Sequence, residues 1–119
     1  MKRDDRVLVV EDNSRVSRAI EAAGVKLCFT CDYATDGWDA IEKIETSDYA
    51  AILIDTDMPR HSGFGVLNYL REEVGEELDH VIVMTSSDRD EVRRKFSGRL
   101  TVVSQDDAVA ELTRVLSVE

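Results

Sequence analysis

Three apolar runs in this sequence end in side chains that carry oxygen atoms. The runs cover residues 7–10, 50–54 and 81–84, and the residues behind them are Glu11 and Asp12, Asp55 and Asp57, and Thr85 and Ser86. If the runs are neighbouring parallel strands, their ends meet at one carboxyl edge, where open α/β sheets place their sites. We therefore expect these oxygen atoms to gather at that edge.

Such a cluster of acids needs a counter-charge at neutral pH. Carboxyl groups with reference pKa values of about 4 are ionised and repel one another at close range. A hard divalent cation relieves this repulsion, and Mg2+ suits a site of carboxylates, a carbonyl, waters and a phosphate oxygen. The metal would also neutralise an incoming phosphoryl group, which leaves one carboxylate available as a nucleophile.

Local composition indicates how these residues are positioned. The run at 50–54 lacks polar alternation, which is typical of a strand covered on both faces, and Pro59 prevents a helix from starting at once. Two more strands are expected at residues 30–34 and 100–103. Apolar residues at helical spacing predict five helices between and after the strands. Their inward positions are Val16, Ala19, Ile20, Ala23 and Leu27; Ala40, Ile41 and Ile44; Phe64, Val66, Leu67, Leu70 and Val74; Val92 and Phe96; and Ala108, Val109, Leu112, Val115 and Leu116.

The alternation of strands and helices predicts an α/β fold, a doubly wound parallel sheet with helices on both faces in three layers. The end of the first helix is ambiguous, because Gly24 could cap it or the helix could continue toward Cys28. Asp36 and Gly37 indicate a turn and the cap of the second helix. We expect Trp38 and Phe64 to be partly buried packing residues.

Length and charge restrict the class of protein. With 119 residues, we expect a single domain spanning 1–119. The formal net charge of −10 argues against unassisted binding to nucleic acid or to an anionic membrane. No apolar run approaches the roughly 18 residues of a membrane span, and Asp4 and Asp5 interrupt any secretory signal. We expect a cytoplasmic protein.

The two cysteines, Cys28 and Cys31, have the spacing of a redox or metal motif. Zinc would need three or four ligands, and the histidines, His61 and His80, lie far along the chain. A redox pair should follow a strand and open a helix, whereas this pair leads from a helix into a strand. We interpret both cysteines as small apolar residues in a reducing compartment.

Taken together, the chain resembles a receiver domain of the two-component response-regulator family. The resemblance covers essentially the whole chain and rests on residues that follow one another in a specific order: Glu11 and Asp12, Asp55 with Met58 and Pro59, Gly63, and Thr85 with Ser86. It implies a flavodoxin-like (βα)5 fold with sheet order 2-1-3-4-5.

The resemblance also implies roles for individual residues. Asp55 would accept a phosphoryl group from a histidine kinase or a histidine phosphotransfer protein, and Thr85 would hydrogen-bond that group and carry the conformational switch. The backbone amides of Thr56 and Ser86 would bind phosphoryl oxygens. The Mg2+ ligands would be Glu11, Asp12, Asp55 and the backbone carbonyl of Asp57. Such a protein is not a conventional enzyme and at most catalyses its own phosphorylation and dephosphorylation.

Two positions depart from the family pattern. Ser104 stands where the family carries a lysine that pairs with the phosphoryl group, and Thr101 stands where it often carries an aromatic switch residue. A neutral hydroxyl donates a hydrogen bond about half as strong as a charge-assisted one. Other basic side chains could reach the pocket, although solvated loop charges are the simpler interpretation for all of them: Arg60, His61 and Arg89.

Three functions therefore stay open. The first is a phosphoacceptor receiver with altered output. The second is a degenerate receiver that docks a partner without phosphorylation. The third, a phosphatase of the haloacid-dehalogenase type built on Asp55 and Asp57, is disfavoured because that family places its motif on the first strand. The cognate kinase and the output partner do not follow from the sequence.

Overall fold

The computed structural model describes residues 5–11, 14–27, 29–56, 62–70, 72, 81–85, 90, 94 and 101–117. Most of the predicted fourth helix, including Val92 and Phe96, lies outside these residues, as do Val74 and the side chain of Phe64. The predicted alternation of strands and helices can be followed in the remainder.

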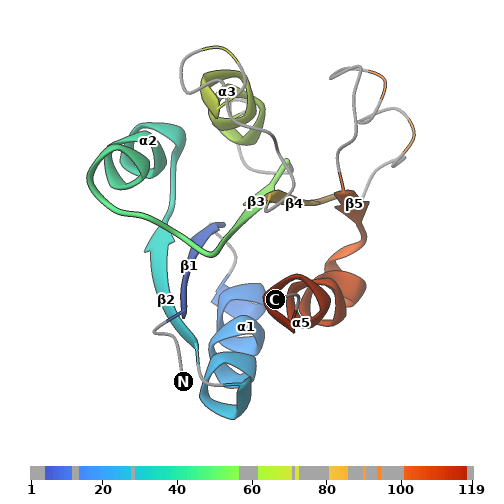
Figure 1. Ribbon diagram of the computed structural model, residues 1–119. Coiled ribbons are helices and arrows are strands. Elements are labelled where there is room, and N and C mark those ends of the chain that lie inside the picture. Colours follow the sequence, from blue (N-terminus) through green and yellow to red (C-terminus); the bar gives the residue numbers. More distant parts are fainter. Residues whose placement is uncertain are drawn as a thin grey trace.

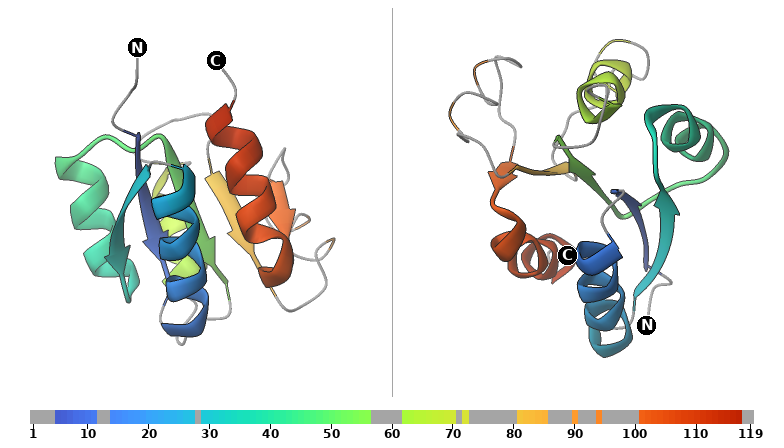
Figure 2. Two further views of the ribbon diagram at one scale, coloured as in Figure 1. Left: turned by 90° about the horizontal axis from the view of Figure 1, so that it is seen from below. Right: turned by 180° about the vertical axis from the view of Figure 1, so that it is seen from behind.

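A parallel sheet of five strands, in the order β2-β1-β3-β4-β5, forms the centre of the molecule (Figure 1). This is the fold that the alternation of elements predicts and the strand order that the family resemblance implies. The strands are β1 (Asp5–Val10), β2 (Phe29–Ala34), β3 (Ala51–Asp55), β4 (Val81–Met84) and β5 (Thr101–Val103). Figure 2 shows them running in the same direction, so that all carboxyl ends lie at one edge.

Helices cover both faces of this sheet. One face carries α2 (Gly37–Thr46) and α3 (Ser62–Tyr69), and the other carries α1 (Ser14–Leu27) and α5 (Ala108–Ser117), which a short 3-10 helix, η3 (Gln105–Asp107), precedes (Figure 1). The tyrosine hydroxyl of Tyr69 donates to Oε2 of Glu45 at 3.1 Å and so links α3 to α2.

The apolar runs of the sequence are buried on both faces, as predicted. Successive strand side chains point to opposite faces. Leu8, Ile52 and Ile54 accordingly belong to the core cluster under α2 and α3, whereas Val9 and Leu53 belong to the cluster under α1 and α5. Each fully buried leucine or isoleucine of this kind contributes about 1.5–3 kcal/mol to folding.

Helix α1 resolves the ambiguity at Gly24, because it continues through that residue to Leu27. A Cβ atom at Gly24 would lie 2.9 Å from the carbonyl oxygen of Phe29 and 3.0 Å from its ring. The glycine therefore allows α1 to pack closely against the start of β2. Ile20 is buried on the same helix, but the predicted inward position Ala19 is exposed.

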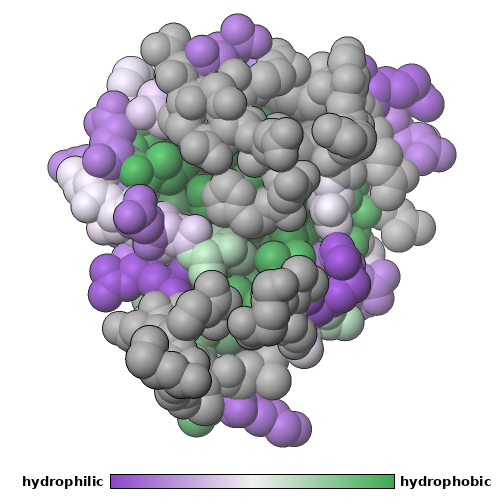
Figure 3. All heavy atoms as spheres, viewed as in Figure 1, coloured by the Kyte–Doolittle hydropathy of each residue, from purple (hydrophilic) through white to green (hydrophobic). Residues whose placement is uncertain are grey.

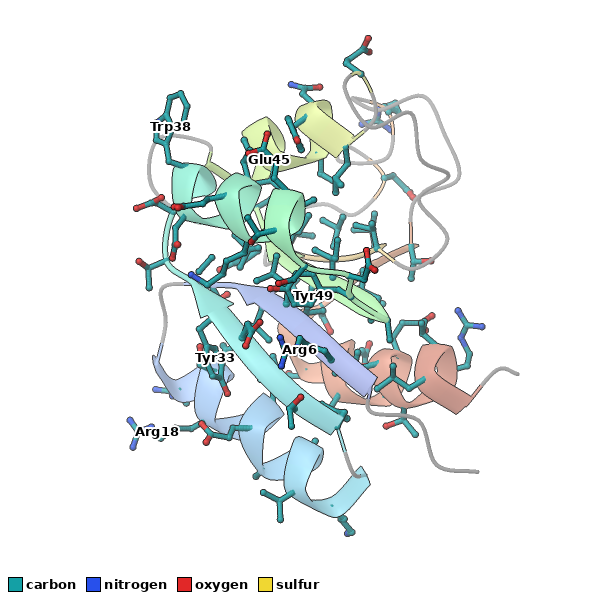
Figure 4. The ribbon with its side chains drawn as sticks, turned by 60° about the vertical axis from the view of Figure 1, so that its left-hand side comes forward. Arg6, Arg18, Tyr33, Trp38, Glu45 and Tyr49 are labelled. Atoms are coloured by element: carbon teal, nitrogen blue, oxygen red, sulfur yellow. The ribbon has the colours of Figure 1, made fainter. Side chains whose placement is uncertain are left out.

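Helix α2 begins at the predicted cap, since Oδ1 of Asp36 accepts a hydrogen bond from the Asp39 amide at 2.8 Å. The expectation that Trp38 is partly buried is wrong: the residue is 86% exposed and projects from α2 (Figure 4). Each helical residue turns by about 100°, so Trp38 lies about 200° around the helix from the buried Ala40.

A polar cluster ties the edge strand β2 to the rest of the sheet. The hydroxyl of Tyr49 donates to Oδ2 of Asp32 at 2.8 Å, and Nη1 of Arg6 lies 3.8 Å from the same oxygen (Figure 4). Burial, together with this hydrogen bond, raises the pKa of Tyr49 to about 12. The cluster spans β2, β1 and the segment before β3, and it therefore fixes the edge strand.

Hydrophobic residues gather toward the middle of the face in Figure 3 and hydrophilic residues toward its outline. No helix in the described part of the chain is long and apolar enough to cross a membrane.

Candidate functional site

The strand register brings the predicted acids to adjacent strand ends. Val9 of β1 pairs with Leu53 of β3, and Val10 pairs with Ile54. The amide of Glu11 donates to the carbonyl of Ala34 at 2.9 Å, which continues the ladder beyond β1. Glu11 and Asp55 therefore occupy the same level of neighbouring strands, as the sequence predicts.

Hydroxyl residues form a second row at the same edge. Ile54 pairs with Val83 of β4, and Val83 pairs with Val102 of β5. Two residues further along these strands stand Thr56, Thr85 and Ser104. Two positions before this row, Ile54, Val83 and Val102 point to the face of α2 and α3. Two positions before the acid pair, Val9 and Leu53 point to the face of α1 and α5.

The site is almost closed to solvent at the described residues. Glu11, Asp55 and Thr85 are each 2% exposed, and Thr56 is 8% exposed. Carboxylates are rarely this deeply buried unless they are paired or bind a metal, because removing a charge from water costs several kcal/mol. Two buried carboxylates at adjacent strand ends thus indicate a functional site.

The donor set fits a hard cation. Glu11 and Asp55 supply carboxylate oxygens, and although Glu11 takes part in other interactions, its Oε1 atom is buried without a hydrogen bond within the described residues. Oxygen ligands of this kind suit Mg2+. The other predicted ligands, Asp12 and Asp57, lie outside the described residues, and within them no third acid, histidine or cysteine joins the pair.

Thr56 has a contact that sequence reasoning missed. Its amide donates to the carbonyl of Met84 at 3.0 Å, and its hydroxyl donates to the same carbonyl at 3.3 Å. Only the side-chain type, a hydroxyl directly after a buried strand, could have drawn attention to it. The predicted role of the Thr56 amide toward phosphoryl oxygens stays a prediction, and that N–H would have to divide its hydrogen bond between the Met84 carbonyl and the phosphoryl oxygen. Ser86 lies outside the described residues.

Ser104 directly follows β5 at the carboxyl edge of the sheet, and it is partly buried. The amide of Thr85 donates to the carbonyl of Val103 at 3.1 Å, and the amide of Asp107 donates to the carbonyl of Ser104 at 3.1 Å. The chain therefore turns into η3 directly after Ser104. Thr101 is partly exposed at the opposite end of β5. The basic residues considered as substitutes for a lysine lie outside the described part: Arg60, His61 and Arg89.

Of the two cysteines, the structure describes Cys31. Cys31 is free, lies within β2 and packs beside the core cluster of α1 and α5. Burial raises the pKa of its thiol, which favours the unreactive protonated form. Cys28 lies outside the described residues.

Comparison with known proteins places the chain in a family. The sequence matches the family described as the response regulator receiver domain over residues 7–110. It is 40% identical over 67 residues to the transcriptional regulatory protein DltR of Streptococcus agalactiae, a match that covers 56% of this chain and 30% of that protein. It is 35% identical over 91 residues to a gliding motility regulatory protein of Myxococcus xanthus, covering 76% of this chain and 12% of that protein. The chain thus spans less than a third of the length of these relatives.

Solved structures agree with the fold. The receiver domain of a sensor histidine kinase from Pseudomonas aeruginosa PAO1, with a magnesium ion coordinated in its active site cleft, superposes with a TM-score of 0.77 at 27% identity, covering 96% of this chain and 95% of that one. The chemotaxis protein CheY4 of Vibrio cholerae gives a TM-score of 0.79 at 19% identity over 95% of this chain and 99% of that one, which shows the fold alone. The family match covers most of the chain and the sheet order agrees with it, so this chain belongs to the response regulator receiver domain family of two-component signalling.

Proposed function

We propose that this receiver domain accepts a phosphoryl group on Asp55 in a reaction that depends on Mg2+. The observation that carries this proposal is the buried pair of carboxylates, Glu11 and Asp55, at the same level of adjacent strands, with the buried Thr85 on the next strand. A carboxylate kept from water, with a hydroxyl donor at the end of the next strand, is suited to act as a nucleophile toward phosphorus.

In this reaction an oxygen of Asp55 attacks the phosphorus of a phosphohistidine. The new O–P bond forms an acyl phosphate while the P–N bond breaks, and the imidazole leaves with the bonding electron pair and takes up a proton. Thr85 donates a hydrogen bond to the transferred group. Glu11, with Asp12, Asp55 and the carbonyl of Asp57, would hold Mg2+, which supplies charge neutralisation for the phosphoryl group.

The proposal also covers the phosphoryl donor, the extent of the domain and the cellular compartment. The donor is a histidine kinase or a histidine phosphotransfer protein, residues 1–119 form one receiver domain, and the protein acts in the cytoplasm. The family match over residues 7–110 supports this setting.

Mass spectrometry tests the phosphoacceptor directly. Treatment of the protein with phosphoramidate and Mg2+ is expected to add one phosphoryl group to wild type and none to Asp55→Asn, because the amide is a much weaker nucleophile than the carboxylate. Glu42→Gln, an exposed acid of α2, serves as the control and should label like wild type. Absence of labelling in wild type under conditions that label another receiver would overturn the proposal.

A second candidate function is docking to a partner protein without phosphorylation, and two residues near β5 motivate it. Ser104 and Thr101 stand where the family usually carries a lysine and an aromatic residue. A receiver that only docks would bind its partner equally well as wild type and as Asp55→Asn, with or without phosphodonor. Binding that requires both Asp55 and the donor would exclude this alternative.

A further inference from the structure

We propose that Thr56 is a positioning residue, whose hydroxyl fixes the peptide unit that carries Thr85. This inference rests on the proposed function, because it concerns the geometry of the same phosphoacceptor site. The peptide unit in question joins Met84, the last residue of β4, to Thr85.

Both sides of this peptide unit are held by neighbouring strands. Its carbonyl oxygen, on Met84, accepts the amide of Thr56 at 3.0 Å and the hydroxyl of Thr56 at 3.3 Å. Its nitrogen, on Thr85, donates to the carbonyl of Val103 at 3.1 Å. The unit is thus held from the end of β3 on one side and from the end of β5 on the other.

The hydroxyl contact is the part that depends on residue type. Any residue other than proline could donate the amide bond, which belongs to the ordinary parallel ladder. Only a hydroxyl side chain at position 56 donates a second bond to the same oxygen. Thr56 is 8% exposed, so water has little access with which to replace that bond.

This arrangement limits how the site can rearrange. Thr56 directly follows Asp55, so the same contact ties the phosphoacceptor strand to the strand end that carries Thr85. With its peptide unit held on both sides, Thr85 can reach a phosphoryl group by rotating its side chain rather than by moving its backbone. Loosening the peptide unit would let Thr85 shift relative to Asp55, which slows a reaction that depends on alignment.

Two substitutions at position 56 separate the hydroxyl from the shape of the side chain. Thr56→Val keeps the branched shape and the amide but removes the hydroxyl, and Thr56→Ser keeps the hydroxyl. Thr113→Val is the matched control, because the Thr113 hydroxyl donates to the Val109 carbonyl at 2.9 Å within α5, away from the carboxyl edge.

The first readout is the rate of labelling by phosphoramidate at saturating Mg2+. The second is the hydrogen exchange rate of the Thr85 amide. The free energy of unfolding of each variant is measured as well, so that a local effect can be told from a general loss of stability. Losing one neutral hydrogen bond corresponds to a change of roughly fivefold. We expect Thr56→Val to label about fivefold more slowly and to exchange the Thr85 amide faster than its global stability explains. Thr56→Ser should stay within about twofold of wild type, and Thr113→Val should lose stability without a change in labelling.

Distinct outcomes would overturn each claim. Labelling of Thr56→Val at the wild-type rate, or equal impairment of Thr56→Ser and Thr56→Val, would show that the hydroxyl does not position the site. Failure of wild type to label would overturn the proposed function and this role with it. Should Thr56→Val not fold, Thr56→Ala removes the same hydroxyl, and its comparison with Thr56→Ser decides the question in the same way.

Discussion

Ser104 is the residue at which the proposed phosphoacceptor site is expected to depart from the family pattern. It stands at the level of Thr85 in the row of hydroxyls at the strand ends, since the last pair in this register is Met84 and Val103. A lysine in that place would offer a charged donor to a phosphoryl group, whereas serine offers a neutral one of about half the strength. We infer that Ser104 would bind the phosphoryl group more weakly than a lysine at the same position.

Restoring the charge should therefore strengthen phosphorylation. We expect Ser104→Lys to raise the rate or extent of labelling of Asp55 by about fivefold, because a charge-assisted hydrogen bond exceeds a neutral one by about 1 kcal/mol. Time courses of labelling by mass spectrometry measure the effect, and Ser104→Met controls for side-chain length. Equal labelling of wild type, Ser104→Lys and Ser104→Met would show that the missing cation does not limit the reaction.

At the level of elements, close packing explains a glycine inside a helix, where helix propensity alone would favour another residue. Glycine inside a helix costs about 1 kcal/mol relative to alanine, yet α1 continues through Gly24. The close approach of Phe29 explains why this position is a glycine, because the Phe29 carbonyl oxygen would lie 2.9 Å from a Cβ atom there. Gly65 of α3 offers the opposite case, because apart from its chain neighbours and its own helix backbone, a Cβ atom there would meet no atom of the described residues within 4 Å.

These two glycines give a matched pair of substitutions. Gly24→Ala should lower the free energy of unfolding by about 1–3 kcal/mol, because α1 must shift away from β2. Gly65→Ala should raise it by about 0.5–1 kcal/mol, because the helix loses a flexible residue and gains no clash. Urea unfolding of both variants measures the difference, and stabilisation by both substitutions would contradict the packing argument.

The molecule as a whole carries a large excess of negative charge. The formal net charge is −10, and two of the acids, Glu11 and Asp55, are buried at one edge of the sheet. Net negative charge and buried carboxylates both oppose folding through repulsion and loss of hydration. A divalent cation that binds only the folded state would offset part of this cost.

Added Mg2+ should accordingly raise the melting temperature. At a concentration one hundred times the dissociation constant, binding contributes about 2.7 kcal/mol, or roughly 10 °C for a domain of this size. Thermal unfolding followed by circular dichroism measures the shift, which should nearly vanish in Asp55→Asn and persist in Glu42→Gln. A shift of the same size from sodium chloride at equal ionic strength would indicate general screening instead of a site.

Much of the fold and part of the candidate site followed from local sequence patterns. The apolar runs predicted the buried strands, and the acids behind two of these runs predicted that Glu11 and Asp55 would lie at one edge. Asp36 predicted the start of α2. These predictions succeeded because burial on two faces, helical spacing and capping are each encoded within a few neighbouring residues.

Tertiary structure alone determined the contacts between segments far apart in the chain. The bond from the Thr56 hydroxyl to Met84 joins residues 28 positions apart, and no local pattern indicates which carbonyl a hydroxyl will find. Likewise, the exposure of Trp38 depends on which side of α2 meets the sheet, and the passage of α1 through Gly24 depends on how near β2 approaches. Sequence periodicity specifies the elements, whereas the exact side that each helix buries and the spacing between elements arise only when the two core layers pack together.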